Sequence, residues 1–147
     1  MTYDEILTRE CILQIIRTRT AFRQALQRML RDTGAGITFE MLQILSCLWK
    51  EQGISQQKLA ERTSKDKACL TNLMTNLERK GYVCRRESAT DRRNKLVYLT
   101  PEGETFRAWI APHLEDFYAG IERQVGRENL QNLMKQLKEL QDVFETY

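Results

Sequence analysis

A leucine-rich segment over residues 67–80 carries two chemically different sets of side chains. The apolar set recurs at intervals of three and four residues, as one face of a helix does, and consists of Leu70, Leu73, Met74 and Leu77. The opposite set is small or hydrogen-bonding and consists of Lys67, Ala68, Cys69, Thr71, Asn72, Thr75, Asn76 and Arg79, with no acidic residue before Glu78. Short side chains let a helix approach the base edges of DNA, and Asn can form two hydrogen bonds with adenine. The segment therefore favours a helix that binds the major groove over an ordinary solvated face, which usually mixes Glu with Lys.

A second basic cluster follows at residues 88–95, which contain Arg92, Arg93 and Lys95. A narrow basic loop can reach into a minor groove, where an arginine is attracted by the negative potential of A·T-rich steps. Asp91 precedes Arg93 by two positions, and we expect it to orient the guanidinium through a charge-assisted hydrogen bond. Taken alone, the loop is equally compatible with a solvated basic turn.

Two short helices joined by a turn are predicted to position the first cluster. Ser55 is placed to cap the first of them, and residues 63–66 form a polar turn before the helix over 67–80. This order of elements predicts a helix-turn-helix. We include Ser55 and Lys65, which begin the first helix and lie in the turn, among the expected DNA-binding residues.

The flanking segments predict a mainly α fold with a small two- to three-stranded β wing. Residues 82–86 and 95–99 are rich in β-branched and aromatic side chains, which predicts a hairpin with residues 87–94 at its tip. Further helices are predicted over 5–31, from a cap at Thr38 to a stop at Gly53, from Thr100–Pro101 onward with a kink at Pro112, and over 130–144, where leucines form a coiled-coil-like seam.

Composition and charge agree with a globular protein that meets a polyanion through its middle. Of the 147 residues, 41% are hydrophobic and 29% charged. Residues 58–95 contain 11 Lys/Arg against 5 Asp/Glu, whereas residues 101–147 contain 5 against 9. No apolar run approaches 18 residues and the first residues are polar, so we expect no membrane contact, no signal peptide and a cytoplasmic location.

The cysteines and the single histidine argue against a metal site, a disulfide framework and an enzyme. Cys11, Cys47, Cys69 and Cys84 are widely spaced, and zinc sites need clustered thiolates or imidazoles. The chain has no phosphate-binding loop, no Ser-His-Asp candidates and no paired carboxylates on a shared face. We therefore expect no cofactor and no catalysis.

Two stretches of the sequence resemble the MarR (multiple antibiotic resistance regulator) family of winged helix-turn-helix transcription regulators. They are "DKACLTNLMTNLERKGYVCR" (66–85) and "DRRNKLVYLTPEG" (91–103), whose Asp91, Arg93, Val97, Leu99, Thr100 and Gly103 match the wing pattern of that family. The resemblance implies that Ala68, Cys69, Thr71, Asn72 and Asn76 face bases or phosphates and that Arg93 enters the minor groove. Many relatives have Ser-Thr in place of Ala68-Cys69 and Arg in place of Asn72, so we expect a different operator.

The family pattern extends over nearly the whole chain and implies a homodimer. We expect a single domain, 1–147, in which residues 5–31 and 101–147 are dimerisation helices around a DNA-binding region at 38–100. The apolar seam of residues 130–144 needs a partner in any case. A two-fold axis presents two recognition helices to a pseudo-palindromic operator with half-sites roughly 34 Å apart, and kinship suggests a repressor.

Regulation has two candidate forms. The resemblance implies a small aromatic effector, for which Phe39, Trp49, Trp109 and Tyr118 are candidate lining residues that also suit a hydrophobic core. The alternative is thiol-based redox sensing through Cys11, which lies on the first helix as in the peroxide-sensing branch of the family, or through Cys69. The tyrosines that would activate Cys11 are not recognisable around it. A winged-helix protein-interaction module is a further alternative, but it would carry apolar side chains on the outer side of the helix over 67–80.

Overall fold

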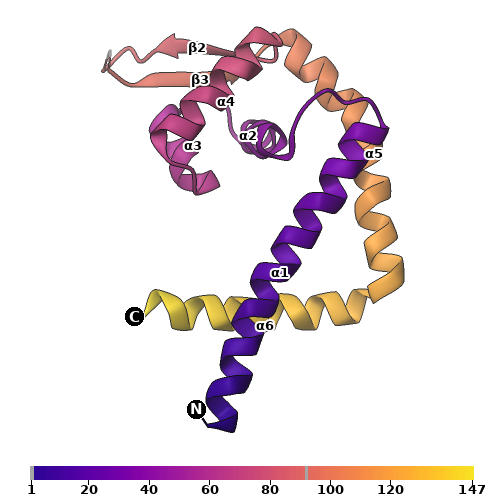
Figure 1. The fold of residues 1–147 in the computed structure, drawn as a ribbon. Coiled ribbons are helices and arrows are strands. Elements are labelled where there is room, and N and C mark those ends of the chain that lie inside the picture. Colours follow the sequence, from indigo (N-terminus) through magenta and orange to yellow (C-terminus); the bar gives the residue numbers. More distant parts are fainter. Residues whose placement is uncertain (1, 92) are drawn as a thin grey trace. The chain divides into compact units, whose positions relative to one another are not determined.

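Helices dominate the described residues, 2–91 and 93–147, of this computed structural model, and a small antiparallel sheet accompanies them (Figure 1). In chain order the elements are α1 (Tyr3–Asp32), α2 (Phe39–Lys50), β1 (Ile54–Ser55), α3 (Gln56–Thr63), α4 (Lys67–Arg79), β2 (Val83–Glu87), β3 (Lys95–Leu99), α5 (Pro101–Val125) and α6 (Arg127–Glu145). The predicted fold class, mainly α with a small β wing, is confirmed. The chain divides into two compact units, of which the first ends at Ile110 and the second begins at Ala111.

The core of the first unit surrounds α2, which contacts α1, α3, α4 and β3. Its fully buried side chains come from each of these layers and include Leu30, Ile44, Leu45, Leu48, Leu59, Met74, Leu77 and Val97. Each such burial contributes about 1.5–3 kcal/mol to stability. The apolar side predicted for residues 67–80 is therefore the side by which α4 packs on α2.

The helix starts follow from capping side chains. The hydroxyl of Thr38 accepts a hydrogen bond from the Met41 N–H, and that of Ser55 accepts one from the Lys58 N–H, as the sequence predicted. Asp66 caps α4 by accepting from the Cys69 N–H at 2.7 Å. Each cap satisfies an N–H that the first helical turn leaves unpaired. The caps at Ser55 and Asp66 fix the starts of α3 and α4, the two helices of the helix-turn-helix.

The wing has three strands, within the predicted two to three, and the third lies outside the predicted hairpin. Strand β3 is central, with β2 on one side and β1 on the other, and all pairs are antiparallel. In β1, Ile54 pairs with Val97, and the preceding Gly53 N–H donates to the Val97 carbonyl at 2.8 Å. A segment of two residues is too short to show the alternation that predicts a strand. Strand β1 is extended because it pairs with the distant β3.

Two hydrogen bonds and a close packing contact join the base of the wing to the start of α5. The Thr100 N–H donates to the Tyr82 carbonyl at 3.1 Å, and the Gly103 N–H donates to the Thr100 hydroxyl at 3.0 Å. A Cβ added at Gly103 would lie 2.2 Å from the Tyr82 oxygen, closer than any side chain allows. Glycine at this position is thus a packing requirement.

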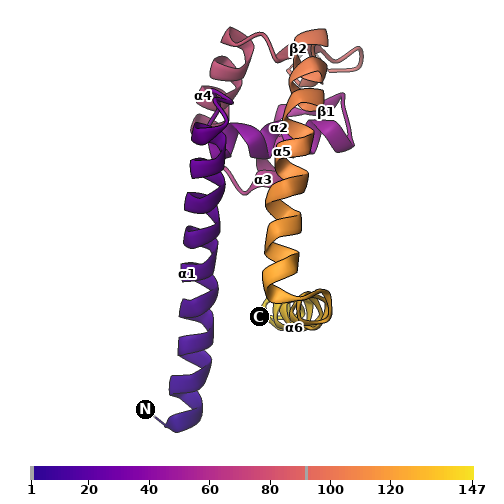
Figure 2. The same cartoon turned by 90° about the vertical axis from the view of Figure 1, so that its right-hand side faces the viewer.

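Helix α1 is a single long helix (Figure 2), and its first half leaves Tyr3, Ile6, Leu7 and Ile16 exposed. Helix α5 continues through Pro112 as one helix. Helix α6, in the second unit, has no buried residue. Among the residues described, no helix has both the length and the apolar character that crossing a membrane requires.

Candidate nucleic-acid interface

The two sides of α4 differ as the sequence predicted. Leu70, Met74 and Leu77 are buried and Leu73 is half-buried. Every polar or small residue expected on the other side is exposed, and we call this set the outward face of α4: Lys67, Ala68, Cys69, Thr71, Asn72, Thr75, Asn76 and Arg79. The exposure of these residues is confirmed, and their contacts with DNA stay a prediction.

The one acidic residue of α4 is turned to an intramolecular partner. Oε1 of Glu78 lies 2.5 Å from Nε of Arg85 on β2, and both side chains are partly buried. A carboxylate that is ion-paired in this way contributes less repulsion toward phosphates than a free one. The outward face of α4 is therefore acid-free along its length.

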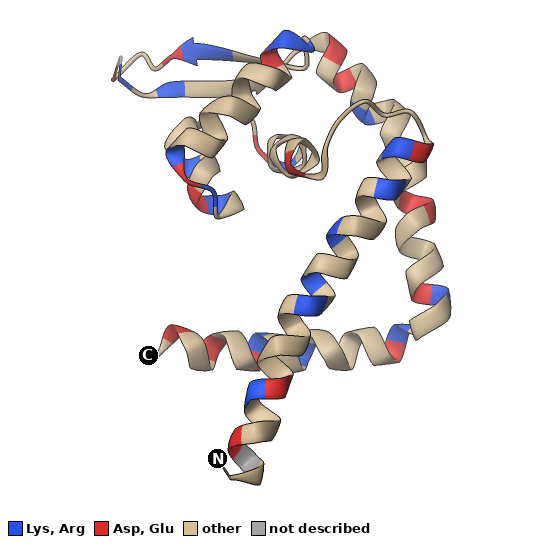
Figure 3. Cartoon of the chain, viewed as in Figure 1, with Lys and Arg blue, Asp and Glu red and all other residues tan. Residues whose placement is uncertain are grey.

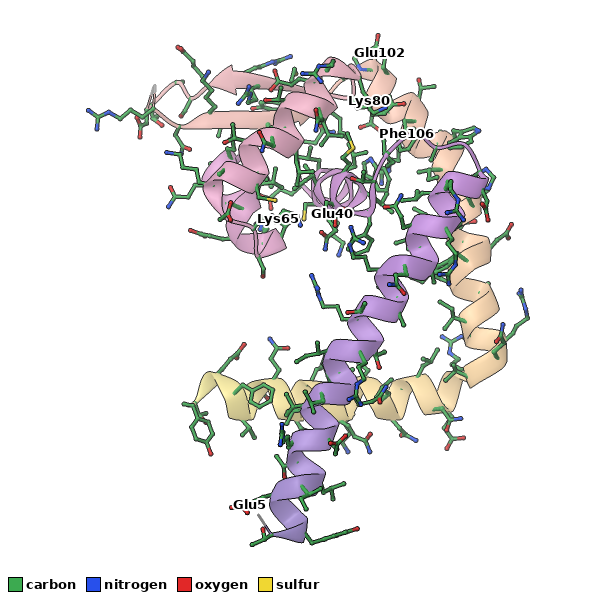
Figure 4. All side chains as sticks on the ribbon, viewed as in Figure 1. Glu5, Glu40, Lys65, Lys80, Glu102 and Phe106 are labelled. Atoms are coloured by element: carbon green, nitrogen blue, oxygen red, sulfur yellow. The ribbon has the colours of Figure 1, made fainter. Side chains whose placement is uncertain are left out.

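The turn before α4 brings a basic residue close to an acidic one. Glu40 of α2 and Lys65 lie near each other (Figure 4), and Glu40 Oε1 accepts from Nε of Arg23 on α1 at 2.8 Å. Burial raises the pKa of the Glu40 carboxyl. The hydrogen bond from Arg23, a hydrogen bond from the backbone and the positive charges of Arg23 and Lys65 together outweigh burial and hold this pKa below its usual value. Lys65 itself is half-buried.

The wing tip is shaped by Asp91 in a way that differs from our expectation. Its Oδ1 accepts from the main-chain N–H of Arg93 at 2.9 Å, where the sequence suggested the guanidinium as partner. The Asn94 N–H also donates to the Asp91 carbonyl at 3.1 Å. Short polar side chains commonly bond the backbone two residues on, and local sequence cannot separate this contact from an ion pair. Arg93 and Lys95 are exposed, and Arg92 lies outside the described residues.

Part of the predicted set lines one cavity of about 540 Å³ between the wing and the helix-turn-helix, which we call the wing cavity. Its lining residues are Gln56, Gln57, Ala60, Lys67, Leu70, Arg85, Arg93, Asn94 and Lys95. Figure 3 shows basic residues on both long strands of the wing and at the turn between α3 and α4. Lys67, Arg93 and Lys95 are thus brought together, whereas Ser55 uses its hydroxyl to cap α3.

Sequence reasoning missed Gln56 and Arg85. Strand alternation from the buried Val83 places Arg85 on the side of β2 that faces the helices, where an arginine needs an acidic partner. This alternation, together with the single acidic residue of α4, could have predicted the pairing of Arg85 with Glu78. Gln56 directly follows the Ser55 cap, and no local pattern marks it.

The candidate regulatory residues of the first unit have different surroundings. Trp109 lines a shallow cavity of about 530 Å³ with Tyr82 and Phe106, whose rings stack at 4.8 Å. Phe39 is buried against Phe22, and Trp49 lies 5.8 Å beneath the Arg107 guanidinium. Phe106 lies in the early turns of α5 (Figure 4), whereas Tyr118 belongs to the second unit. Cys11 and Cys69 are both exposed free thiols, and their redox activity stays a prediction.

Comparison with known proteins identifies the family of this chain. The family model described as "MarR family" matches residues 37–95. The regulator FarR of Neisseria gonorrhoeae is 29% identical over 131 residues, 87% of this chain and 88% of FarR. A protein described as a transcriptional regulator for the hcr operon of Thauera aromatica is 31% identical over 121 residues, 80% of this chain and 71% of its own.

Solved structures agree with these sequence matches. The crystal structure of NadR in complex with 4-hydroxyphenylacetate superposes with a TM-score of 0.72 at 30% identity, and the match covers 87% of this chain and 89% of NadR. The relatives are transcription regulators and not enzymes. The chain belongs to the MarR family of DNA-binding transcription regulators.

Proposed function

We propose that this chain binds a pseudo-palindromic operator as a homodimer and represses transcription by occupying it. Each protomer places the outward face of α4 in a major groove and the wing tip in an adjacent minor groove. The observation that carries the proposal is the exposure of an acid-free, hydrogen-bonding helix face within the same unit as exposed Arg93 and Lys95. The predicted DNA-binding set is retained as part of it.

Homodimer formation is supported by apolar surface that the chain leaves uncovered. Leu133, Met134, Leu137, Val143 and Phe144 of α6 are all at least 40% exposed, as are Ile6, Leu7 and Ile16 of α1. Exposed apolar residues gathered along helices are typical of association surfaces. We accordingly assign residues 5–31 and 101–147 to dimerisation, with 38–100 as the DNA-binding region. A closed two-fold dimer then sets the half-site spacing at roughly one helical turn.

The test is fluorescence anisotropy with two duplexes. One is the DNA upstream of the chain's own gene, and the other is a duplex that the wild-type protein selects from a random pool. Affinity should fall steeply between low and physiological salt because phosphate contacts release counterions. Arg93→Ala should weaken binding about tenfold and reduce the salt slope by about one. The matched control is Arg28→Ala, which removes the same charge from an exposed position on α1.

Absent or salt-independent binding would refute DNA recognition and favour the protein-interaction alternative. Repression is tested separately by transcription in vitro from the bound upstream region. A rise in transcript on adding the protein would identify an activator and contradict the repressor proposal.

A small aromatic effector is the form of regulation that we propose. It is supported by the cavity that Tyr82, Phe106 and Trp109 line, and by the aromatic acid in the NadR complex. With 4-hydroxyphenylacetate as probe, DNA affinity should fall as the probe is added, and Trp109→Ala should abolish this response. Trp49→Phe is the control for the other tryptophan. An unchanged affinity with the wild-type protein would contradict this part of the proposal for that ligand.

A further inference from the structure

A chain of contacts crosses the winged region from the end of α4 to the middle of its outward face. Glu78 is ion-paired with Arg85 Nε at 2.5 Å. Arg85 Nη1 donates to Gln56 Oε1 at 3.3 Å, and Gln56 Nε2 donates to the Thr71 hydroxyl oxygen at 3.5 Å. The chain links α4, β2 and α3 and returns to α4, so it connects elements that no local sequence pattern joins.

The direction of the donors in this chain is determined at both ends. Arginine has no acceptor, so Gln56 must turn its oxygen toward Arg85 and its amide N–H groups toward Thr71. The Thr71 hydroxyl in turn donates to the Lys67 carbonyl at 2.8 Å. Its proton is therefore already used within the protein, and what Thr71 offers to a ligand is an acceptor lone pair and a methyl group.

We propose that Glu78, Arg85 and Gln56 are positioning residues that fix the orientation of the Thr71 hydroxyl and thereby set base preference at one position of each half-site. This inference rests on the proposed DNA-binding function and deepens it. An acceptor in the major groove pairs with the amino group of adenine or cytosine, and a methyl group packs on that of thymine. A guanine or thymine oxygen would need a donor, whereas the Thr71 proton is donated to the Lys67 carbonyl.

Glu78 has a double role in this arrangement. Its charge orients Arg85, and the same ion pair removes the acid of α4 from the surface that meets DNA. Replacing Glu78 with glutamine keeps the size of the side chain and loses the charge, so Arg85 is no longer held. Gln56 then loses its fixed partner, and its amide no longer has to present a donor to the Thr71 hydroxyl oxygen.

The experiment measures discrimination and not affinity alone. The wild-type protein selects its operator from a random duplex pool, and each base pair of one half-site is then substituted in turn. Glu78→Gln and Gln56→Ala should each lower discrimination about tenfold at one shared position, and Thr71→Val should lose it at the same position. The matched control is Glu61→Gln, which removes one negative charge from an exposed position on α3.

Both Glu→Gln variants raise the net charge by one and should tighten binding to random-sequence DNA. The decisive measurement is made in the Thr71→Val background, where Glu78→Gln and Gln56→Ala should cause no further loss. Thermal melting of each variant accompanies the titrations, and Gln56→Ala leaves the ion pair in place should Glu78→Gln fold poorly.

Two outcomes would overturn the inference. Losses of discrimination spread evenly over all base pairs, or losses that persist in the Thr71→Val background, would identify the Glu78–Arg85–Gln56 contacts as purely structural. Full discrimination in both Glu78→Gln and Gln56→Ala would show that Thr71 needs no positioning. If the wild-type protein itself selects no sequence, the proposed function fails instead, so the two failures are distinguishable.

Discussion

Helices α4 and α6 both carry leucines at intervals of three and four residues, yet the two faces meet opposite environments. On α4, Leu77 and Met74 are fully buried against the core of the first unit. On α6, Leu137 is 40% exposed and Phe144 is 51% exposed. Because burial satisfies the apolar side of α4 within the chain, only its polar side is left for a ligand. Helix α6 leaves its apolar side exposed, and in our proposal a partner protomer covers that side.

The comparison shows that an apolar period predicts a helix and its buried side, but not what covers that side. The same pattern serves folding in α4 and, in our proposal, association in α6. Substitutions on the corresponding sides should therefore separate stability, oligomeric state and DNA binding.

The largest effect is expected from the inner side of α4. Leu77→Ala removes a fully buried side chain and should lower the free energy of unfolding by about 2–5 kcal/mol, because it leaves a cavity in the core. Urea denaturation followed by circular dichroism measures this. The corresponding change on α6, Leu137→Ala, should cost far less when the protein is diluted below its dimerisation range. Equal losses of unfolding free energy in the two variants would show that the apolar sides of α4 and α6 contribute alike to the stability of the monomer.

A charge on the apolar side of α6 should break the dimer. Leu137→Asp places a carboxylate in the proposed interface and should raise the dimer dissociation constant by roughly a hundredfold or more, because an unpaired charge is costly to bury. Analytical ultracentrifugation gives the constant directly. Gln131→Asp, at an exposed polar position of the same helix, is the control and should remain dimeric. A dimeric Leu137→Asp would place the interface elsewhere.

The outer side of α4 should affect DNA binding without affecting stability. Asn72 is exposed, and Asn72→Ala should cost about 1–3 kcal/mol of discrimination at one base pair if it makes a two-bond contact with a base. Its unfolding midpoint should match that of the wild type. An Asn72→Ala variant that binds the selected operator as tightly as the wild type would exclude Asn72 from base contact.

A smaller, pH-dependent effect is expected where α1 meets α2. The pKa of Glu40 is lowered in the folded protein from its ordinary value of 4.5. Its ion pair with Arg23 therefore stabilises the fold fully above about pH 4.5, and this contribution is lost as the pH falls through the lowered folded-state pKa. The stability difference between the wild type and Glu40→Gln should shrink on acidification in that window. A difference that stays constant from pH 7 to pH 3 would contradict this assignment.

The sequence predicted most of the fold because local rules determine most of it. The spacing of Leu70, Met74 and Leu77 predicted the buried side of α4, and the caps at Thr38 and Ser55 predicted two helix starts. A third strand lay within the predicted two to three, but its position escaped prediction because two residues have no detectable period. Strand β1 forms through pairing with β3, more than forty positions away.

The sequence predicted which residues of the candidate site are exposed. It did not predict the side-chain contacts that support them. Exposure of Thr71 and Asn72 follows from helix geometry, whereas the contact of Gln56 with Arg85 joins positions 29 apart in the chain. For Asp91, the sequence suggested a side-chain partner and the structure shows a main-chain one. Residue types alone cannot decide between these two geometries, since a carboxylate accepts from either donor.

The main-chain contact of Asp91 separates the shape of the wing tip from its charge. An amide oxygen could accept from the Arg93 N–H as well as a carboxylate does, so the bend of the loop needs no negative charge. The charge that remains opposes phosphates beside the very arginine that attracts them. If the wing enters a minor groove as we propose, Asp91 makes it hold an operator less tightly than its cations alone would, and the protein then leaves the operator sooner.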